Sequence, residues 1–338
     1  MFTPQTFTVA LIMTIVSAVC WGSWANTYKL TRGYRFELFY WDYAVGIVAA
    51  ALIGALTLGS LWPSDSGERF IVNATSADTG NIAAALAGGF IFNVANLLLV
   101  AAIEMAGLAV AFPLSIGIAL VVGVVMSYVL QPRGNPAVLS MGVALAILAV
   151  IFDGKAYGEL ARRAGPRDRM STAPRASRKS IVVCLVSGVL MGSFAPFVTR
   201  ALTSGHALGP YTVAVFFTLG AFLCCFIVNV YFMRRPLVGA PLDFSGFAAA
   251  GTRNHLLGIA GGLVWGTGMV FNFVAASFVG VAISYAIGQS APMVAALWGV
   301  LVWREFAGAP PSARVYLALM FASYVGAIAV IANAYGSG

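Results

Sequence analysis

The stretch AGGFIFNVANLLLVAAIEMAGLAVAFPLSIGIALVVGVVMSYVL, residues 87–130, contains a single charged side chain, Glu104. A helix needs about 20 apolar residues to cross the hydrocarbon core of a bilayer. The stretch is long enough for two such helices, and only the short connection EMAG separates them. It therefore predicts two membrane-spanning helices joined by a tight turn.

The composition extends this prediction to the whole chain. Of the 338 residues, 60% are hydrophobic and 9% are charged, and the mean hydropathy is +0.91. A soluble domain carries about 25% charged residues. A transmembrane β-barrel would show segments of about ten residues that alternate between apolar and polar side chains, and the apolar runs here do not alternate. We predict an all-α polytopic membrane protein.

Ten apolar runs are long enough to cross the membrane as helices. They cover residues 6–30, 37–60, 80–104, 107–130, 136–152, 180–203, 209–232, 254–278, 280–303 and 312–334. No positive charge precedes the first run and no small-x-small cleavage pattern follows it, so we expect a retained helix rather than a signal sequence. The connections EMAG and FVG predict tight hairpins between the third and fourth runs and between the eighth and ninth.

The basic side chains predict the orientation. Of the 19 Lys and Arg residues, 16 fall in the loops on one side of the predicted bundle. The positive-inside rule then places both termini outside and the central linker in the cytoplasm. This bias accounts for the net charge of +8, so nucleic acid is not an expected partner, while the linker can lie against anionic lipid. We expect a plasma membrane protein, which in a bacterium means the inner membrane.

The chain also resembles itself. AGGFIFNVAN from Ala87 returns as AGGLVWGTGM from Ala260, an offset of 173, and SAVCWGSWA returns as SGVLMGSFA at an offset of 170. These similar offsets predict two five-helix repeats, 1–152 and 180–338, joined by a basic cytoplasmic linker, 153–179. Because five is odd, the second repeat enters the membrane inverted, as in secondary transporters that bind solute between their halves.

Polar and aromatic side chains recur inside the apolar runs at helical spacing. Residues three and four apart share one helix face, and polar groups at mid-membrane face a cavity or another helix. We predict a solute-binding cleft with aromatic rings for a flat solute and amides for its hydrogen-bonding edges. The predicted binding residues are Trp24, Asn93, Asn96, Trp265, Asn272, Tyr285 and Gln289. The alternative is that the amides only join helices to one another.

Two acids are candidates for ion coupling. Asp42, in FYWDYAVG, and Glu104, in AAIEMAG, lie near the predicted inner surface. A carboxyl group partly withdrawn from water can exchange a proton near neutral pH, so Asp42 is the first candidate and Glu104 the second. The alternative is that each acid merely ends a helix at the head groups, which we prefer for Glu305 beside Arg304. Every acid lies near a membrane surface by this interpretation, which argues against an exporter of cations.

No pattern typical of an enzyme is present. His206 and His255 stand alone in or beside loops, and the four cysteines lie in apolar runs without a C-x-x-C pair. The central linker lacks a phosphate-binding G-x-x-x-x-G-K-[ST] motif. We expect no catalytic site, no metal and no cofactor, with H⁺ as the coupling ion.

Several motifs resemble known transporters. The ten runs, the fused repeats and the tight hairpins resemble the drug/metabolite transporter superfamily. Within it, GGFIFNVANLLL (88–99), YFMRRPLVGAP (231–241) and ISYAIGQSAPMVAALWGVLVWREF (283–306) look most like the ureide permeases. The segment FPLSIGIALVVGVVMSYVL (112–130) is also similar to the branch that contains the L-rhamnose and glucose permeases.

The resemblance implies a function. The ureide branch implies proton-coupled uptake of allantoin-like ureides and nucleobases, and the sugar branch implies monosaccharide uptake. Members of the ureide branch carry an acid at the position of Asp42, whereas Glu104 has no recognised counterpart. We expect a protein of the lipid bilayer that imports a small polar solute by alternating access, in which the binding site opens to one side of the membrane at a time. We expect it to act as a monomer or homodimer.

Two alternatives stay open at this point. An exporter of lipophilic cations would place an uncompensated acid deep in a helix. A membrane scaffold that carries no solute would have no cavity at the midplane.

Overall fold

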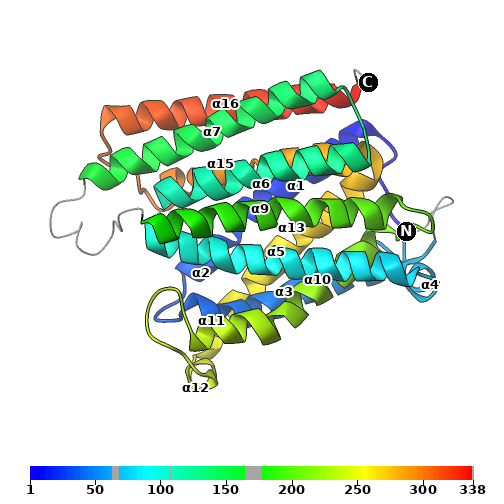
Figure 1. Ribbon diagram of the computed structural model, residues 1–338, viewed down its shortest axis with the longest axis horizontal. Coiled ribbons are helices and arrows are strands. Elements are labelled where there is room, and N and C mark those ends of the chain that lie inside the picture. The colour runs from blue at the N-terminus through cyan, green and yellow to red at the C-terminus, as the bar shows by residue number, and fades with distance from the viewer. Residues whose placement is uncertain (63–67, 107, 164–176, 337–338) are drawn as a thin grey trace.

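The computed structural model describes residues 1–62, 68–106, 108–163 and 177–336, and the regular structure within them is helical. Nine of the described helices are long and apolar enough to cross a membrane, and Leu114–Leu130 forms a shorter apolar helix. Hydrocarbon offers peptide groups no hydrogen-bond partner, so each span satisfies its backbone within a helix. The predicted all-α polytopic fold with ten spans is confirmed, and the spans form one bundle (Figure 1).

The first half of the chain supplies five spans and one short helix outside them. Its helices are α1 (Phe7–Ser23), α2 (Ala25–Lys29), α3 (Phe36–Leu56), α4 (Phe70–Thr75), α5 (Thr79–Ala106), α6 (Leu108–Leu130) and α7 (Pro136–Arg163). The short helix α2 continues the first span beyond Trp24. The fifth span, α7, runs well past its predicted end at residue 152, so Asp153 lies inside a helix. The predicted linker included Asp153, whereas the structure places it within this helix.

The second half repeats this plan with two interrupted spans. Its helices are α9 (Arg178–Thr203), α10 (Pro210–Cys224), the π-helical turn η1 (Cys225–Asn229), α11 (Val230–Arg234), α12 (Phe244–Ala248), α13 (Thr252–Val279), α14 (Val281–Gly288), α15 (Ala291–Leu301) and α16 (Pro311–Gly336). The seventh span passes from α10 through η1 into α11. The ninth span is divided into α14 and α15.

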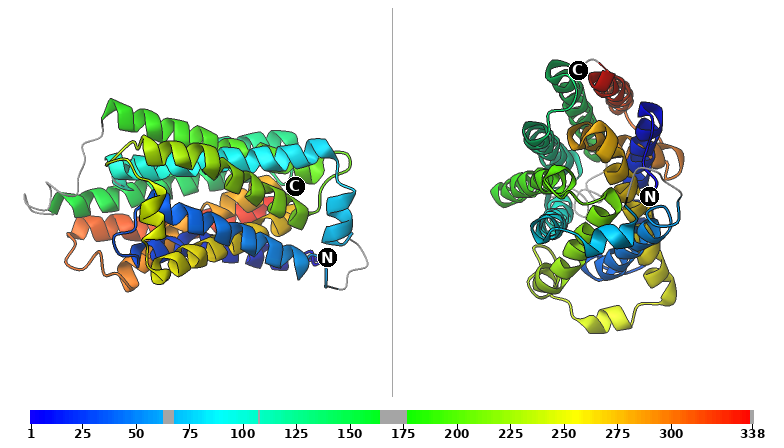
Figure 2. Two further views of the ribbon diagram at one scale, coloured as in Figure 1. Left: turned by 90° about the horizontal axis from the view of Figure 1, so that it is seen from below. Right: turned by 90° about the vertical axis from the view of Figure 1, so that its right-hand side faces the viewer.

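The two ends of the bundle differ. Both termini lie at one end, which we call the terminal end (Figures 1 and 2). At the opposite end α7 finishes and α9 begins, while α12 lies at the lower edge of the bundle beside α11. We call this the basic end, because the loops and helix ends there hold most of the lysines and arginines that the structure describes. The predicted grouping of the basic loops on one side of the bundle is present.

The helix contacts repeat when the two halves are exchanged. The third span packs on the sixth (α5 on α9), and correspondingly the eighth packs on the first (α13 on α1). The pairs α3 with α13 and α10 with α5 correspond in the same way, as do α6 with α9 and α15 with α1. The fifth and tenth spans, α7 and α16, pair with each other at the side of the bundle (Figure 1). This pattern is the one expected of inverted repeats, while the boundaries at 152 and 180 stay a prediction.

Local chemistry explains the hairpin and the break in the ninth span. Gly280 joins α13 to α14 with a φ of 87°, a left-handed conformation that favours glycine. The other predicted hairpin, at EMAG, includes Gly107, which lies outside the described residues. Pro292 falls in the first turn of α15 and has no N–H to donate, so it cannot make the helical hydrogen bond back to Gly288.

Glycines allow α3 and α13 to touch along their backbones. A side chain on Gly262 would press against the carbonyl oxygen of Tyr43, and its Cβ would lie 2.8 Å from the Cα of Gly46. A side chain on Gly46 would press against the carbonyl of Ile259 in the same way. This contact joins the first half of the chain to the second half, so it sets the position of α13 relative to α3.

We expect Gly262→Ala to destabilise the protein, because overpacking a close helix contact costs about 1–3 kcal/mol. The matched control is Gly117→Ala on α6, where an added Cβ would meet nothing within 4 Å. The measurement is the unfolding temperature of each purified variant in detergent. Equal unfolding temperatures for the two variants would contradict the close α3–α13 contact.

Candidate solute site between the two halves

An aromatic stack lies where the two halves meet. Trp265 of α13 stacks on Phe92 of α5, with ring centroids 4.7 Å apart and planes 26° apart. Its ring also faces Trp21 of α1, at 5.8 Å and 18°. The stack thus combines rings from both halves around the predicted residue Trp265. Such faces suit a flat solute better than a branched one.

Trp24 joins this stack through a residue that the sequence analysis did not single out. Its ring lies 4.7 Å from that of Tyr43 on α3, and Tyr43 lies 6.4 Å from Trp265. The structure therefore brings both predicted indoles next to the ring of Tyr43. We call Trp21, Trp24, Tyr43, Phe92 and Trp265 the aromatic cluster.

The two predicted amides of α5 are held together by another missed residue, Tyr40. The Tyr40 hydroxyl donates to Asn93 Oδ1 and accepts from Asn96 Nδ2 at 3.0 Å. Asn93 Nδ2 also donates to Cys225 Sγ at 3.6 Å, in the π-helical turn η1. Both amides are buried, and their bonds join α5 to α3 and to the seventh span. This is the interhelical use that the sequence left open as the alternative.

Asn272 and Tyr285 also lie in helix contacts. Asn272 Nδ2 donates to the Ser284 carbonyl at 3.0 Å, and Ser284 Oγ donates back to the Asn272 carbonyl at 2.9 Å, so the pair closes the α13–α14 hairpin. The Tyr285 hydroxyl donates to the carbonyl of Ala119 on α6 at 3.3 Å. Tyr285 therefore points toward α6 and α9 rather than toward the face of α13 that carries Trp265.

Gln289 occupies the break between α14 and α15. It is partly exposed, and its side-chain amide makes no hydrogen bond to any residue that the structure describes. Gly288 just before it lets the chain approach Trp21, since an added Cβ would lie 2.7 Å from Trp21 Cζ3 and 2.9 Å from Asn272 Nδ2. The break therefore lies against the aromatic cluster, in the position that discontinuous helices take in transporters.

Two polar atoms of the aromatic cluster have no partner. Trp21 Nε1 and the Tyr43 hydroxyl are buried and make no hydrogen bond within the described parts of the chain. Ser17 Oγ, one helical turn before Trp21, is also buried and makes no hydrogen bond to a described residue. Leaving a buried donor unpaired costs about 1–3 kcal/mol. A solute with carbonyl oxygens would satisfy these donors.

The site is tightly packed in this conformation. Asn93, Trp265 and Tyr285 are 1%, 8% and 1% exposed. None of the predicted binding residues lines the two hollows described below. Entry of a solute therefore requires the helices to move apart.

Asp42 forms a polar group near the basic end. Its Oδ2 accepts from the Tyr34 hydroxyl at 2.7 Å and lies 2.9 Å from His255 Nδ1. Burial and the bond to Asp42 raise the pKa of Tyr34, so the phenol keeps its proton and acts as the donor. Asp42 is 6% exposed, and its contact with His255 joins α3 of the first half to α13 of the second.

The expectation that His255 stands alone was therefore wrong. Asp42 and His255 are 213 residues apart in the chain, and no local motif connects them. The tight approach of α13 to α3 brings them together, with Gly258 packed directly against Asp42.

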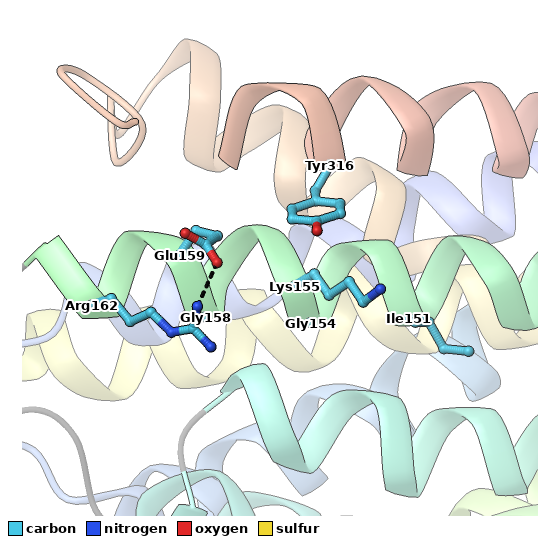
Figure 3. A pocket seen from close by; sticks show the side chains of 7 residues that line it. All are labelled: Ile151, Gly154, Lys155, Gly158, Glu159, Arg162 and Tyr316. Carbon is cyan, nitrogen blue, oxygen red and sulfur yellow. Dashed lines mark hydrogen bonds and ion pairs between the residues drawn. The ribbon is translucent and has the colours of Figure 1, made fainter. Parts of the chain in front are cut away.

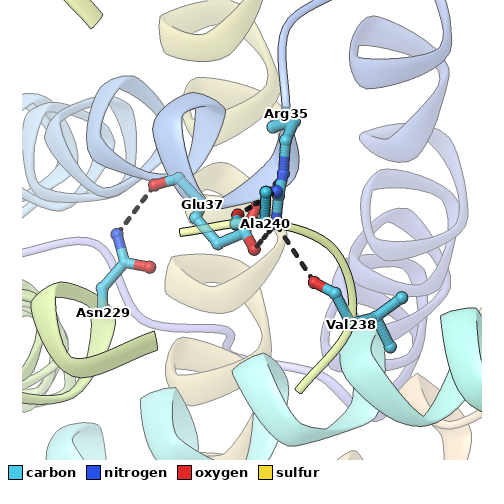
Figure 4. Close-up of polar contacts among 5 residues, drawn as sticks. All are labelled: Arg35, Glu37, Asn229, Val238 and Ala240. Carbon is cyan, nitrogen blue, oxygen red and sulfur yellow. Dashed lines mark hydrogen bonds and ion pairs between the residues drawn. The ribbon is translucent and has the colours of Figure 1, made fainter. Parts of the chain in front are cut away.

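Glu104 lies apart from Asp42. It is exposed at the basic end, where it lines a small cavity of about 30 Å³ together with Glu37 and Val238. Beside this cavity Arg35 pairs with Glu37 and donates to the carbonyls of Ala240, at 2.7 Å, and of Val238, at 3.3 Å (Figure 4). The cluster fastens the loop after α11 to the start of α3.

A larger groove of about 460 Å³ lies between α7 and α16. Lys155, Glu159, Arg162 and Tyr316 line it (Figure 3). It lies on the helix pair at the side of the bundle, away from the aromatic cluster. No group of three or more His, Cys, Asp or Glu residues in the described chain could hold a metal ion.

We expect Tyr40→Phe to destabilise the protein by about 1–3 kcal/mol, because the buried amides of Asn93 and Asn96 would lose their shared partner. The matched control is Tyr231→Phe, since Tyr231 is 54% exposed. Thermal unfolding in detergent measures the difference. If both variants unfold at the wild-type temperature, the Tyr40 bridge contributes nothing to stability.

Comparison with known proteins gives the family. The model of the ureide permease family matches residues 39–181 and 179–334. Ureide permease 1 of Arabidopsis thaliana is 25% identical over 97% of this chain and 97% of its own length. Ureide permease 4 of the same plant is 23% identical over 95% and 96% of the two chains. Both are named as permeases, in agreement with the prediction of a transporter rather than an enzyme.

A solved crystal structure shares the fold. It covers 96% of this chain and 96% of its own, with a TM-score of 0.65 and 15% sequence identity. Two matched segments that together take in nearly every span confirm the resemblance seen in the sequence motifs. The chain is a multi-pass membrane protein and belongs to the ureide permease family.

Proposed function

We propose that this chain imports a flat, amide-bearing solute of the ureide or nucleobase type by proton symport. The observation that carries the proposal is the pair of unpartnered donors, Trp21 Nε1 and the Tyr43 hydroxyl, in a cluster of stacked rings. Ureides and nucleobases present carbonyl acceptors at the edge of a planar group. The rings would contact the plane, and the two donors would bind the edge.

Alternating access fits the way the halves meet. The aromatic cluster takes rings from α1, α3 and α5 of the first half and from α13 of the second. The break beside it at Gln289 would let α14 and α15 move separately, since Pro292 has no N–H to bond back into α14. Rocking one half against the other would open the cluster to one side at a time.

Asp42 is the residue that we propose for proton exchange. It bridges the halves through His255 at 2.9 Å. A proton bound by Asp42 removes the charge that attracts the imidazole, so binding a proton would weaken the contact between α3 and α13. Glu104 is a weaker candidate, since its carboxylate is exposed and does not bridge the halves.

We propose that the terminal end faces outside and the basic end faces the cytoplasm of a plasma membrane, the inner membrane in a bacterium. The support is the concentration of Lys and Arg in the loops of the basic end. The chain would act as a monomer or homodimer, because its two fused halves already enclose the site.

Uptake into proteoliposomes tests the substrate class. We expect labelled allantoin or uracil to accumulate when the lumen is more alkaline than the medium, and to equilibrate only without the gradient. Glucose and rhamnose serve as matched controls for the sugar alternative and should not accumulate. Uptake of the sugars alone would replace the ureide proposal, and uptake of none of the four would refute import.

We expect Asp42→Asn to reduce gradient-driven accumulation about tenfold or more, within the usual range of coupling between sites. Exchange of solute across the membrane without a gradient should continue, because Asn keeps the shape of the side chain but cannot release a proton. Asp243→Asn is the matched control, since Asp243 is a loop residue that caps α12. Wild-type accumulation in Asp42→Asn would remove Asp42 from the coupling mechanism.

Export of lipophilic cations is the second candidate, and one observation favours it. Asp153 is an acid buried within α7, 4% exposed, with no basic partner among the described residues. The uptake experiment therefore includes labelled tetraphenylphosphonium. Proton-driven movement of this cation, with no movement of allantoin or uracil, would favour export.

A further inference from the structure

Asp153 is a buried carboxyl group that the proposed mechanism does not use. Its Oδ1 makes no hydrogen bond within the described residues. The basic side chain beside it in sequence, Lys155, instead lies over the ring of Tyr316, 5.3 Å from its centroid, in the groove of Figure 3. An ionised carboxylate without a partner is strongly disfavoured in such a place. Asp153 therefore favours the protonated, neutral form as long as it stays buried.

Two tyrosines flank this carboxyl group. Tyr157 follows it by one turn of α7, and Tyr324 lies on α16, which packs on α7, in the apolar cluster that includes Val150 and Ala156. Tyr324 is fully buried, and its hydroxyl also lacks a partner in the described chain. In α6, which also packs on α7, the titratable side chain is Tyr128, and it donates to the Gly134 carbonyl. No cation is therefore seen to compensate Asp153 from these elements.

Tyr157 connects Asp153 to the basic end. Its hydroxyl donates to Glu305 Oε2 at 3.4 Å, and Glu305 forms an ion pair with Lys29 at the end of α2. Glu305 belongs to the second half and Lys29 to the first. The Tyr157 side chain thus lies between the carboxyl group of Asp153 and the Lys29–Glu305 ion pair that joins the two halves.

Two indoles strengthen the same contact. Trp303 Nε1 donates to Asn26 Oδ1 at 2.6 Å, and Trp298 Nε1 donates to Ser23 Oγ at 2.9 Å. Lys29 Nζ also lies 4.4 Å from the centroid of the Trp303 ring. We call this set of bonds between residues 23–29 and 298–305 the basic-end latch.

We propose that Asp153 is a second proton-binding site, linked through Tyr157 and Glu305 to the basic-end latch. The proposal of a moving latch rests on the proposed alternating-access function, whereas proton binding at Asp153 does not. When Asp153 is protonated, its carboxyl group does not compete for the Tyr157 hydroxyl, which keeps its hydrogen bond to Glu305. When the proton leaves to water, the carboxylate attracts that hydroxyl and needs hydration, so opening of the latch becomes favourable. Rising pH should therefore open the basic end.

Infrared difference spectroscopy on the purified full-length protein tests the proton. Subtracting the spectrum of Asp153→Asn from that of the wild type at neutral pH should leave the carbonyl band of a protonated carboxylic acid. The matched control, Asp243→Asn, should leave a carboxylate band instead, because Asp243 lies in an exposed loop where its hydrogen bonds to Ser245 lower its pKa. A carboxylate band for Asp153 would overturn the proposal and point to a bound cation. This result does not depend on any solute being carried.

Spin labels test the latch. The four native cysteines are replaced by alanine, and labels are attached to Arg32→Cys and Ala307→Cys, which are exposed in loops of the two halves at the basic end. We expect the long-distance population to grow with pH, by up to about tenfold per pH unit for one proton. Asp153→Asn and Tyr157→Phe should both abolish this dependence, and Tyr231→Phe should keep it.

The two variants separate the steps of the proposal. Tyr157→Phe should retain the protonated-acid band while losing the pH dependence of the label distance. If Tyr157→Phe keeps the wild-type pH dependence, the link to the latch is wrong. If the band is present but no distance changes with pH in the wild type, the link is overturned while proton binding at Asp153 stands.

Discussion

Hydrocarbon cannot hydrogen-bond to a peptide group, and the rest of this structure depends on that constraint. Each span must be helical, and each departure from the helix must be sheltered by protein. The two departures in the spans of the second half, η1 and the break at Gln289, both meet this condition. Asn93 reaches Cys225 in η1, and Trp21 lies against Gly288 beside the break. Irregular backbone is therefore found beside the candidate site, where neighbouring helices cover it.

Close contacts at glycines determine which helices of the bundle pack against each other. Without a hydrophobic driving force between helices in lipid, close packing and hydrogen bonds decide which faces meet. Gly46 and Gly262 bring α3 onto α13, and Gly89 and Gly220 do the same for α5 and α10. These two pairs correspond when the halves are exchanged. The inverted architecture is therefore carried by small residues rather than by the polar ones.

The polar groups serve two purposes. Asn272 with Ser284 and Tyr40 with Asn93 and Asn96 join helices and are satisfied. The donors of Trp21 and Tyr43 are not satisfied, and they lie in one aromatic cluster between the halves. At the basic end, the contact of Asp42 with His255 and the ion pair of Lys29 with Glu305 join the two halves. A carrier needs this division, since its packing must persist while its charged contacts break and reform.

The amino-acid sequence by itself determined the ten spans, the tight hairpin at Gly280, the grouping of the basic loops and the family. These follow from local properties, because the length and apolarity of a run decide whether it can cross hydrocarbon. Two of the five residues of the aromatic cluster, Trp24 and Trp265, were also foreseen. Only the tertiary structure decided which polar groups meet: it set Tyr40 between two amides, paired Asp42 with His255 and buried Asp153 beside Tyr324. Such pairings depend on how each helix is rotated against a distant partner, and that rotation is fixed by glycine contacts between residues far apart in the chain.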